Sequence, residues 1–384
     1  MSGSVESERV SDLAAARLIA QLTSREFSSG VKEHPEIDAE LATKIVRIAR
    51  VNKLLKPVLK QFQAIGVPLP EEVKPDVAVY LRRSGKKNAK ALATLREVTR
   101  KFSEAGILHA AFKGPVRQIL LGQDVFERPA ADVDILVKYD DFARATALLK
   151  EMGYWIPLFC DSPWWRHYLG EHALLPDDPN RLGVDLHHRT QQPSCPRPRH
   201  EEAMLNDLAW TEIGGERIPG FGPTSIFLNT VMSIVKGLTN HEPVGQHVLD
   251  LARQLHAADG ERLAAFDQAA RYQALERSYA FARRAVIALT GVSRVPTEQW
   301  VVPDDTLVAM LITPWDPSIQ WPRHRQLLWD LVDGDSWFSR AMRFTREIAW
   351  WTAAELTRRT HDVSRLPARM DEMDEKTAPA PAAL

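Results

Sequence analysis

The central third of the chain alternates short apolar runs with helical patterns, and this alternation restricts the fold more than any other feature of the sequence. Residues 107–112 and 133–137 are apolar runs of strand length, and each is followed by residues whose apolar positions recur at helical spacing. Residues 182–187 show a further alternating strand pattern. Strands that alternate with helices predict a mixed α/β unit with its strands side by side.

Helical patterns flank this unit on both sides. Apolar residues recur at helical spacing over residues 11–62 and again from Pro223 to about residue 359. The proline-bearing stretch at residues 67–76 interrupts the first pattern and indicates a linker. We therefore expect an α+β protein with a small mixed sheet, flanked by helical amino-terminal and carboxy-terminal regions.

The length of 384 residues suits two or three domains rather than one. We predict a helical amino-terminal region at 1–75, an α/β core at 76–222 and a helical carboxy-terminal domain at 223–365. We expect a disordered tail at 366–384, because residues 377–384 are almost only alanine and proline and cannot form a hydrophobic core.

Charge and cysteine content narrow the class of protein. Lys and Arg number 49 against 50 Asp and Glu, so net charge does not attract the chain to long nucleic acid, which is not the expected partner. The two cysteines, Cys160 and Cys195, form no disulfide framework in their spacing. The start of the chain lacks the apolar core of a signal peptide, and no run of about eighteen apolar residues occurs. We expect a cytoplasmic protein that does not enter a membrane.

Two aspartates at the start of the second strand carry the strongest chemical signal. Asp132 and Asp134 are separated by one residue, and alternate residues of a strand point to the same face. Two carboxylates held this close favour a hard divalent cation such as Mg²⁺. Two such ions about 3.5–4 Å apart can hold both the attacking and the leaving oxygen of a phosphoryl displacement. Read alone, an Asp-x-Asp pair at the end of a strand is usually part of a turn or a cap.

Asp185 is the candidate third carboxylate. It lies between apolar residues in the strand pattern at 182–187, where a neighbouring strand can bring it beside the first pair. There it would bind one metal and accept the proton of an acceptor hydroxyl, or help lower the pKa of that hydroxyl. The alternative is an edge-strand carboxylate paired with Arg181 or Arg189.

Three residues upstream indicate a phosphate site. Lys113 and Gly114 lie where a strand ends and a helix begins, and a helix amino terminus offers free N–H groups to a phosphate. Lys113 and Arg128 would offset the charge of a bound triphosphate. Lys113 can instead be a solvated lysine, and Arg128 can instead be a structural residue at the turn before Asp132.

Further groups of polar side chains admit both functional and structural interpretations. Basic residues over 44–60 form a stripe on a helix that would bind RNA, an acidic partner or a membrane surface, or would simply face solvent. A second basic group at 82–90 is expected in a solvated loop. Three histidines have the wrong spacing for a zinc site with Cys160 or Cys195, and we expect them to support the aspartates or to bond within the core. The stripe comprises Lys44, Arg47, Arg50, Lys53, Lys56 and Lys60, and the histidines are His172, His187 and His188.

The motifs form an ordered set along the chain. They are Phe112-Lys113-Gly114, Glu127-Arg128-Pro129, Asp132-Val133-Asp134-Ile135-Leu136-Val137, Gly153-Tyr154, His172 and Val184-Asp185-Leu186-His187. Together they resemble the uncharacterised bacterial nucleotidyltransferase family of the DNA polymerase β superfamily. The resemblance covers residues 107–188 and extends more loosely to about Leu255, through a helix that contains Asp250. Lys113-Gly114 stands where the superfamily usually has Gly-Ser, and Ala130-Ala131 replaces a turn with glycine.

The resemblance implies a polymerase β-like core and the transfer of a nucleoside monophosphate from a nucleoside triphosphate, with Mg²⁺ or Mn²⁺ as cofactor. It implies that Asp132 and Asp134 bind both metals, that Asp185 binds the catalytic one, and that Lys113 and Gly114 lie near the phosphates. The balanced charge favours a small molecule or a protein as acceptor. Two other functions stay open, a nucleotide-binding module without turnover and an RNA-directed nucleotidyltransferase.

Overall fold

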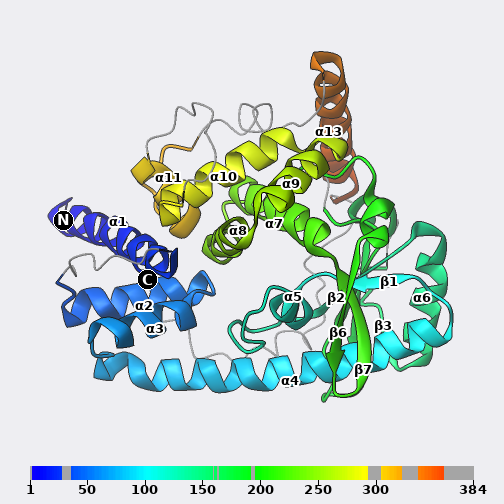
Figure 1. The fold of residues 1–384 in the computed structure, drawn as a ribbon, viewed down its shortest axis with the longest axis horizontal. Helices are drawn as coiled ribbons and strands as arrows, with labels where there is room; N and C mark the ends of the chain where they lie inside the picture. Colours follow the sequence, from blue (N-terminus) through cyan, green and yellow to red (C-terminus); the bar gives the residue numbers. More distant parts are fainter. Residues whose placement is uncertain are drawn as a thin grey trace.

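A computed structural model of the chain describes residues 2–27, 36–158, 160–161, 164–191, 195–292, 304–321 and 336–358. A seven-stranded mixed sheet lies at one end of the molecule, and α1, α2, α3 and α11 gather at the other (Figure 1). The strands are β1 (His109–Ala111), β2 (Val133–Val137), β3 (Tyr154–Trp155), β4 (Glu171–Pro176), β5 (Val184–His187), β6 (Leu208–Ile213) and β7 (Glu216–Phe221).

The helices fall into three groups along the chain. Those before the sheet are α1 (Ser2–Ser24), α2 (Ala39–Val51), α3 (Leu55–Ile65) and α4 (Lys74–Glu104), with short 3-10 turns η1 (Arg25–Phe27) and η2 (Glu71–Val73). Those between strands are α5 (Gly114–Leu120), α6 (Tyr139–Glu151), the π-helical turn η3 (Trp164–Leu169) and the 3-10 turn η4 (Glu201–Asn206). Those after the sheet are α7 (Pro223–Thr239), α8 (Gly245–Ala257), α9 (Gly260–Tyr272), α10 (Glu276–Thr290), α11 (Asp304–Ile312) and α13 (Trp337–Arg358).

The strands are ordered β3-β4-β5-β2-β1-β7-β6. In the middle of the sheet β2 pairs with β5 in parallel, and Asp134 stands opposite Asp185 in the register. On its other side β2 pairs antiparallel with β1, where Ile135 stands opposite Ala111. The two central strands that carry the predicted acids are therefore direct neighbours.

The side chains of β2 alternate between the two faces of the sheet, and this places the predicted acid Asp134 on one of them. Val133, Ile135 and Val137 are buried in a core shared with α4 and α6. Leu136 belongs to the other core, with α7 and α8. Because side chains alternate along a strand, Asp134 shares the face of Leu136 and points away from α4 and α6.

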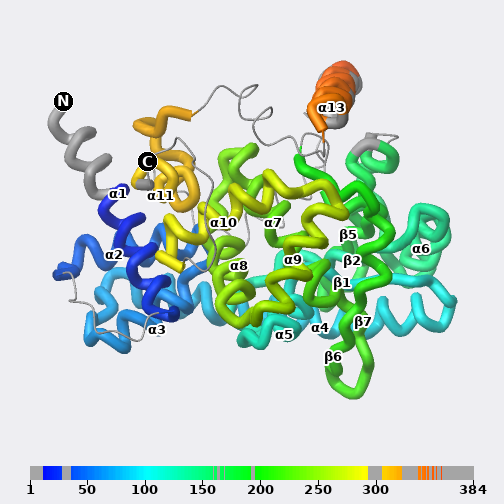
Figure 2. The backbone as a smooth tube through the Cα atoms, turned by 45° about the horizontal axis from the view of Figure 1, so that its top comes forward, coloured from blue at the N-terminus to red at the C-terminus, as the bar shows by residue number. Residues whose placement is uncertain are grey.

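Helices from the two ends of the chain share one hydrophobic core. This core joins apolar residues of α1, α2 and α3 to those of α7, α8, α10 and α11, and α1 lies close to α11 in both views (Figures 1 and 2). Its most deeply buried members include Ile19, Ile45, Leu55, Val231, Leu251 and Val286. The first helices are thus packed on α7, α8, α10 and α11, while α4 runs from them to the sheet (Figure 1).

The structure confirms the α+β fold with a mixed sheet and helices on both flanks. The strand predicted at 133–137 forms with those bounds, and the strand predicted at 182–187 forms as β5. The expectation of a loop at 82–90 is wrong, because these basic residues lie within the 31-residue helix α4, which starts at Lys74 and contains Gly85. The bounds of the four predicted segments stay predictions, and the tail predicted at 366–384 lies outside the described residues.

The β6–β7 hairpin had no counterpart among the predicted elements. Its two strands are joined by Gly214 and Gly215, whose φ angles are +58° and +84°. A two-residue turn with positive φ at both positions matches the right-handed twist of a hairpin, and glycine adopts it without a steric penalty. The hairpin adds β7 to the sheet beside β1.

Within the described residues, no helix has both the length and the apolar character that crossing a membrane requires.

A buried ionic group fixes the helices to the core next to the sheet. The Asp250 carboxylate, on α8, accepts hydrogen bonds from Arg117 of α5 at 2.7 Å and from both terminal nitrogens of Arg128 at 2.7 and 2.8 Å. Gln123 also donates to Asp250 at 2.9 Å. Burial acts to raise the pKa of Asp250, but Arg128 and Arg117 outweigh it and hold this pKa below the usual range.

We expect Asp250→Ala to lose about 3–5 kcal/mol of the free energy of unfolding, because it leaves Arg117 and Arg128 buried without their carboxylate. Asp305→Ala is the control, since it removes an exposed ion pair with Arg17 and should lose no more than about 1 kcal/mol. Urea unfolding followed by circular dichroism measures both losses. Equal losses in the two variants would contradict the structural role of the buried group.

Candidate active site

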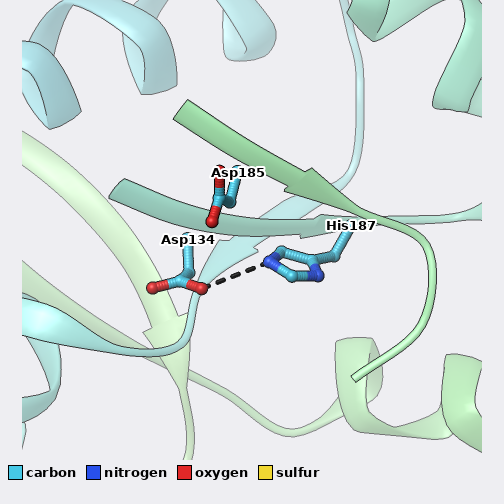
Figure 3. Close-up of side chains that lie close together, drawn as sticks. All are labelled: Asp134, Asp185 and His187. Carbon is cyan, nitrogen blue, oxygen red and sulfur yellow. Dashed lines mark hydrogen bonds and ion pairs between the residues drawn. The ribbon is translucent and has the colours of Figure 1, made fainter. Parts of the chain in front are cut away.

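The parallel pairing of β2 and β5 brings two predicted acids together. Asp134 and Asp185 are partners in the register, and their carboxylates lie on the same face of the sheet with His187 beside them (Figure 3). One ligand atom from each of Asp134, Asp185 and His187 lies within 4.8 Å of the others. The sequence expectation that Asp185 comes close to Asp134 therefore agrees with the geometry.

His187 is the member of this group that the sequence did not single out as a ligand. It follows Asp185 by two residues on β5, so both side chains face the same way. Its Nε2 atom is 3.2 Å from Asp134 Oδ1, and its Nδ1 atom is 3.3 Å from Glu171 Oε2 on β4. The imidazole is thus held between two carboxylates, and its orientation is fixed.

The strand-to-helix turn at Lys113 and Gly114 lies against the same acids. Lys113 Nζ is 2.5 Å from Asp134 Oδ1, the oxygen that also faces His187. Gly114 has a φ of +61°, and a Cβ there would lie 4.0 Å from the backbone oxygen of Asp132. The backbone N–H of Phe112 donates to Asp134 O at 3.3 Å. The structure therefore places Lys113 and Gly114 directly beside Asp132 and Asp134.

Burial and neighbouring charges push the pKa values of the acids in different directions. Burial acts to raise the pKa of Asp134, but Lys113 and His187 hold it below the usual range. Burial raises the pKa of Asp185 to about 7. Asp132 and Asp134 add to this rise, while His187 opposes it. The pKa of Asp132 is raised by burial and by Asp134, which shows that the acids act on one another.

Arg128 lies apart from these acids in the structure. Its guanidinium bonds Asp250, and it also donates to Gln123. The backbone around it is held by Asn88, a fully buried residue of α4, which donates to Arg128 O at 2.7 Å and accepts from Ala130 N at 2.7 Å. These contacts match the structural interpretation of Arg128, and they hold the segment that leads into Asp132.

The alternatives raised by the sequence can be compared with the geometry. Arg181 bonds Glu97 at 2.5 Å and Met152 O at 2.5 Å, so it is not the partner of Asp185. His188 Nε2 is 2.8 Å from Arg166 O, and His172 Nδ1 is 3.2 Å from Thr146 Oγ1. These two histidines bond within the core, while His187 supports the aspartates. Neither Cys160 nor Cys195 forms a disulfide.

The basic stripe is not the continuous helix face that the sequence predicted. It is broken by a turn at Asn52, Lys53 and Leu54, between α2 and α3. Two of its lysines are in ion pairs, Lys44 with Asp12 at 2.5 Å and Lys56 with Asp124 at 3.2 Å. Lys53 instead interacts electrostatically with Asp132 and Asp134. No pattern in the sequence indicated this, because residue 53 reaches the acids only through the packing of α2 and α3 on the later helices.

The group formed by Asp134, Asp185 and His187 fits a divalent cation. Carboxylate oxygens suit Mg²⁺ and Mn²⁺, and an added imidazole nitrogen suits ions with a stronger preference for nitrogen. The position already holds a positive charge, since Lys113 Nζ lies 2.5 Å from Asp134 Oδ1. Asp132 precedes the strand and adds negative charge next to the group.

Comparison with known proteins connects this geometry to a family. A family model described as an uncharacterised nucleotidyltransferase matches residues 38–290. The chain belongs to this nucleotidyltransferase family. The match spans α2 to α10 and so includes the acids, the turn at Lys113 and the helix of Asp250. It confirms the resemblance that the ordered motifs indicated.

Two further comparisons complete the findings for this nucleotidyltransferase family member. Curated proteins give no match. Among solved structures, an antigenic nucleotidyltransferase-like protein from Paracoccidioides brasiliensis is similar at 15% identity and a TM-score of 0.31, with coverage of 53% of this chain and 98% of that chain.

The raised pKa of Asp185 predicts a pH-dependent contribution to stability in the presence of EDTA. An aspartate has a pKa of about 3.9 when unfolded, so between about pH 4 and pH 7 the folded state binds more protons than the unfolded state. Stability from Asp185 is therefore present at low pH and lost as the pH rises through 7.

We expect the free energy of unfolding of the wild type, relative to Asp185→Asn, to fall by about 1–3 kcal/mol between pH 4 and pH 7 and then to level off. Urea unfolding of both proteins across this range measures the difference, and the subtraction removes the contributions of histidines common to both. A difference that stays constant or grows with pH would contradict the assigned shift.

Proposed function

We propose that this protein is a metal-dependent nucleotidyltransferase that moves a nucleoside monophosphate from a nucleoside triphosphate to a small-molecule or protein acceptor and releases pyrophosphate. The observation that carries this proposal is the in-register pairing of Asp134 with Asp185, with Asp132 immediately before the same strand. Membership of the nucleotidyltransferase family supports the same reaction class.

In the proposed reaction an acceptor oxygen forms a bond to the α-phosphorus, and the bond from that phosphorus to the bridging oxygen of pyrophosphate breaks. Asp185 is proposed to take the proton of the acceptor hydroxyl, because it lies opposite Asp134 at the centre of the site. Divalent metal held by Asp132, Asp134 and Asp185 would stabilise the negative charge that gathers on the phosphate oxygens.

The other residues of the site divide between phosphate binding and support. Lys113 and Gly114 are proposed to face the phosphates of the donor, because their turn adjoins Asp132 and Asp134. His187 keeps Asp134 in place and is itself oriented by Glu171. Arg128 is proposed to hold the segment before Asp132 through Asp250 rather than to bind phosphate.

The balanced charge of the chain supports a small acceptor. An RNA acceptor gains no support from the basic stripe, since Lys44 and Lys56 are engaged by Asp12 and Asp124.

Transfer is tested with each of the four α-labelled nucleoside triphosphates, Mg²⁺ or Mn²⁺ and a cell extract. We expect one molecule in the extract to become labelled, and Asp134→Ala to lower the rate by about 10²–10⁴-fold because it removes a group required at the reacting centre. Asp140→Asn is the control, since this aspartate is exposed at the start of α6. Binding of nucleotide with neither labelling nor pyrophosphate release would instead support a binding module without turnover.

Metal binding is tested separately from turnover. A ligand that binds only the folded state at about 100 times its dissociation constant stabilises it by about 2.7 kcal/mol, so Mn²⁺ should raise the free energy of unfolding of the wild type by about this amount. The double variant Asp134→Asn, Asp185→Asn should lose the effect, and Asp140→Asn should keep it. Equal stabilisation of the double variant by Mn²⁺ would place the metal elsewhere.

A further inference from the structure

The turn between α2 and α3 holds a lysine in a backbone conformation that favours glycine. Lys53 has a φ of +54°. Two backbone hydrogen bonds cap the carboxy-terminal end of α2. They run from Lys53 N to Arg50 O at 3.1 Å and from Leu54 N to Ala49 O at 2.8 Å. This pattern is the Schellman motif, whose left-handed position is usually glycine and sometimes asparagine. A lysine here is conformationally unfavourable, and such residues cluster at functional sites.

The residues on both sides of Lys53 are fixed to the carboxy-terminal helices. Asn52 is almost fully buried, and its side chain donates to Ile312 O at 2.7 Å and accepts from Gly245 N at 3.2 Å. Gly245 approaches the turn so closely that a Cβ there would lie 2.7 Å from Leu54 Cδ1. The backbone of Lys53 is therefore held rigidly, and only its side chain has room to adjust.

The ammonium of Lys53 lies within electrostatic range of the acids at β2. It is attracted by Asp132 and Asp134 and repelled by Arg128 and Lys113. Burial lowers the pKa of Lys53, while the two aspartates oppose this change. Among the described residues no carboxylate pairs directly with Lys53, in contrast to Lys44 and Lys56 of the same stripe. A half-buried cation without a carboxylate partner is thus positioned beside the proposed catalytic group.

We propose that Lys53 binds the β- and γ-phosphates of the donor nucleotide, so that the amino-terminal helices complete the active site. This inference rests on the proposed function. Lys53 interacts electrostatically with Asp132 and Asp134 but forms no ion pair with either of them, so its ammonium is available for a phosphate. In the proposed reaction the bonds change at the α-phosphorus next to the metal ligands, and the β- and γ-phosphates of the leaving pyrophosphate carry further charge that a cation outside the acid group can neutralise. A lysine ammonium binds phosphate as a compact point charge.

The conformation of the turn permits a test that preserves the fold. Lys53→Asn removes the ammonium but introduces a residue that tolerates a left-handed backbone, so the midpoint of thermal unfolding should stay the same or rise. Lys53→Gly is the second variant and should be at least as stable. Lys60→Gln is the control for the loss of one charge, because Lys60 is exposed on α3 of the same stripe.

The measurement is calorimetric titration with Mg²⁺ and a triphosphate whose α,β-bridge is methylene, for each of the four bases, and with the corresponding monophosphate. We expect Lys53→Asn and Lys53→Gly to bind the triphosphate about 10- to 100-fold more weakly, as for loss of a charged hydrogen bond. Their affinity for the monophosphate, and both affinities of Lys60→Gln, should stay within about twofold of the wild type.

Each outcome separates this inference from the proposed function. Wild-type triphosphate affinity in both Lys53 variants, or an equal loss for triphosphate and monophosphate, overturns the role of Lys53 and leaves the transferase proposal intact. Failure of the wild type to bind any of the four triphosphates with Mg²⁺ or Mn²⁺ overturns both.

Discussion

The parallel pairing of β2 with β5 is the constraint on which the rest of the site depends. It sets two carboxylates opposite each other at the centre of a sheet, where burial and mutual repulsion both oppose their ionisation. Placing Asp134 and Asp185 opposite each other therefore does not favour folding, so the stability of the fold alone does not explain the arrangement. Lys113 and His187 both approach Asp134 Oδ1 and favour the ionised form of Asp134, while the pKa of Asp185 is raised to about 7. The mutual repulsion of these acids therefore favours the binding of a cation at the site.

Support for this pairing comes from far along the chain. Asp250 binds Arg117 and Arg128, and so ties α8 to the helix after the Lys113 turn and to the segment before Asp132. Asn88 holds the same segment from the other side, through bonds to the backbone at 128 and 130. Buried ion pairs and hydrogen bonds of Asp250 and Asn88 therefore hold the segments next to the acids in place. Such contacts are directional, so they fix geometry more sharply than apolar packing does.

The sequence was informative where chemistry and periodicity coincide. The strand at 133–137, the strand of Asp185 and the turn at Lys113 could be predicted, because each is a local pattern of apolar and charged residues. His187 could also have been assigned, since it follows Asp185 by two residues on one strand. The position of Arg128 was ambiguous, because its partner Asp250 is 122 residues away. Lys53 could not be assigned at all, since its place depends on a helix turn docking on residues from the opposite end of the chain. The β6–β7 hairpin was missed for a different reason. Gly214-Gly215 predicts a hairpin turn only when the residues on both sides of it are recognised as strands.

Two long-range hydrogen bonds of the Asn52 side chain affect the order in which the protein can assemble. They join residue 52 to partners 193 and 260 positions later in the chain, at Gly245 and Ile312. During synthesis the amino-terminal helices leave the ribosome long before either partner exists, and the bond to Ile312 cannot form until α11 has emerged. Contacts this distant in sequence also slow folding, since a long loop must close before they form. A polypeptide that extends past α8 but ends before α11 would contain every strand and Asp250, but it would lack the Ile312 partner that helps to fix the turn of Lys53.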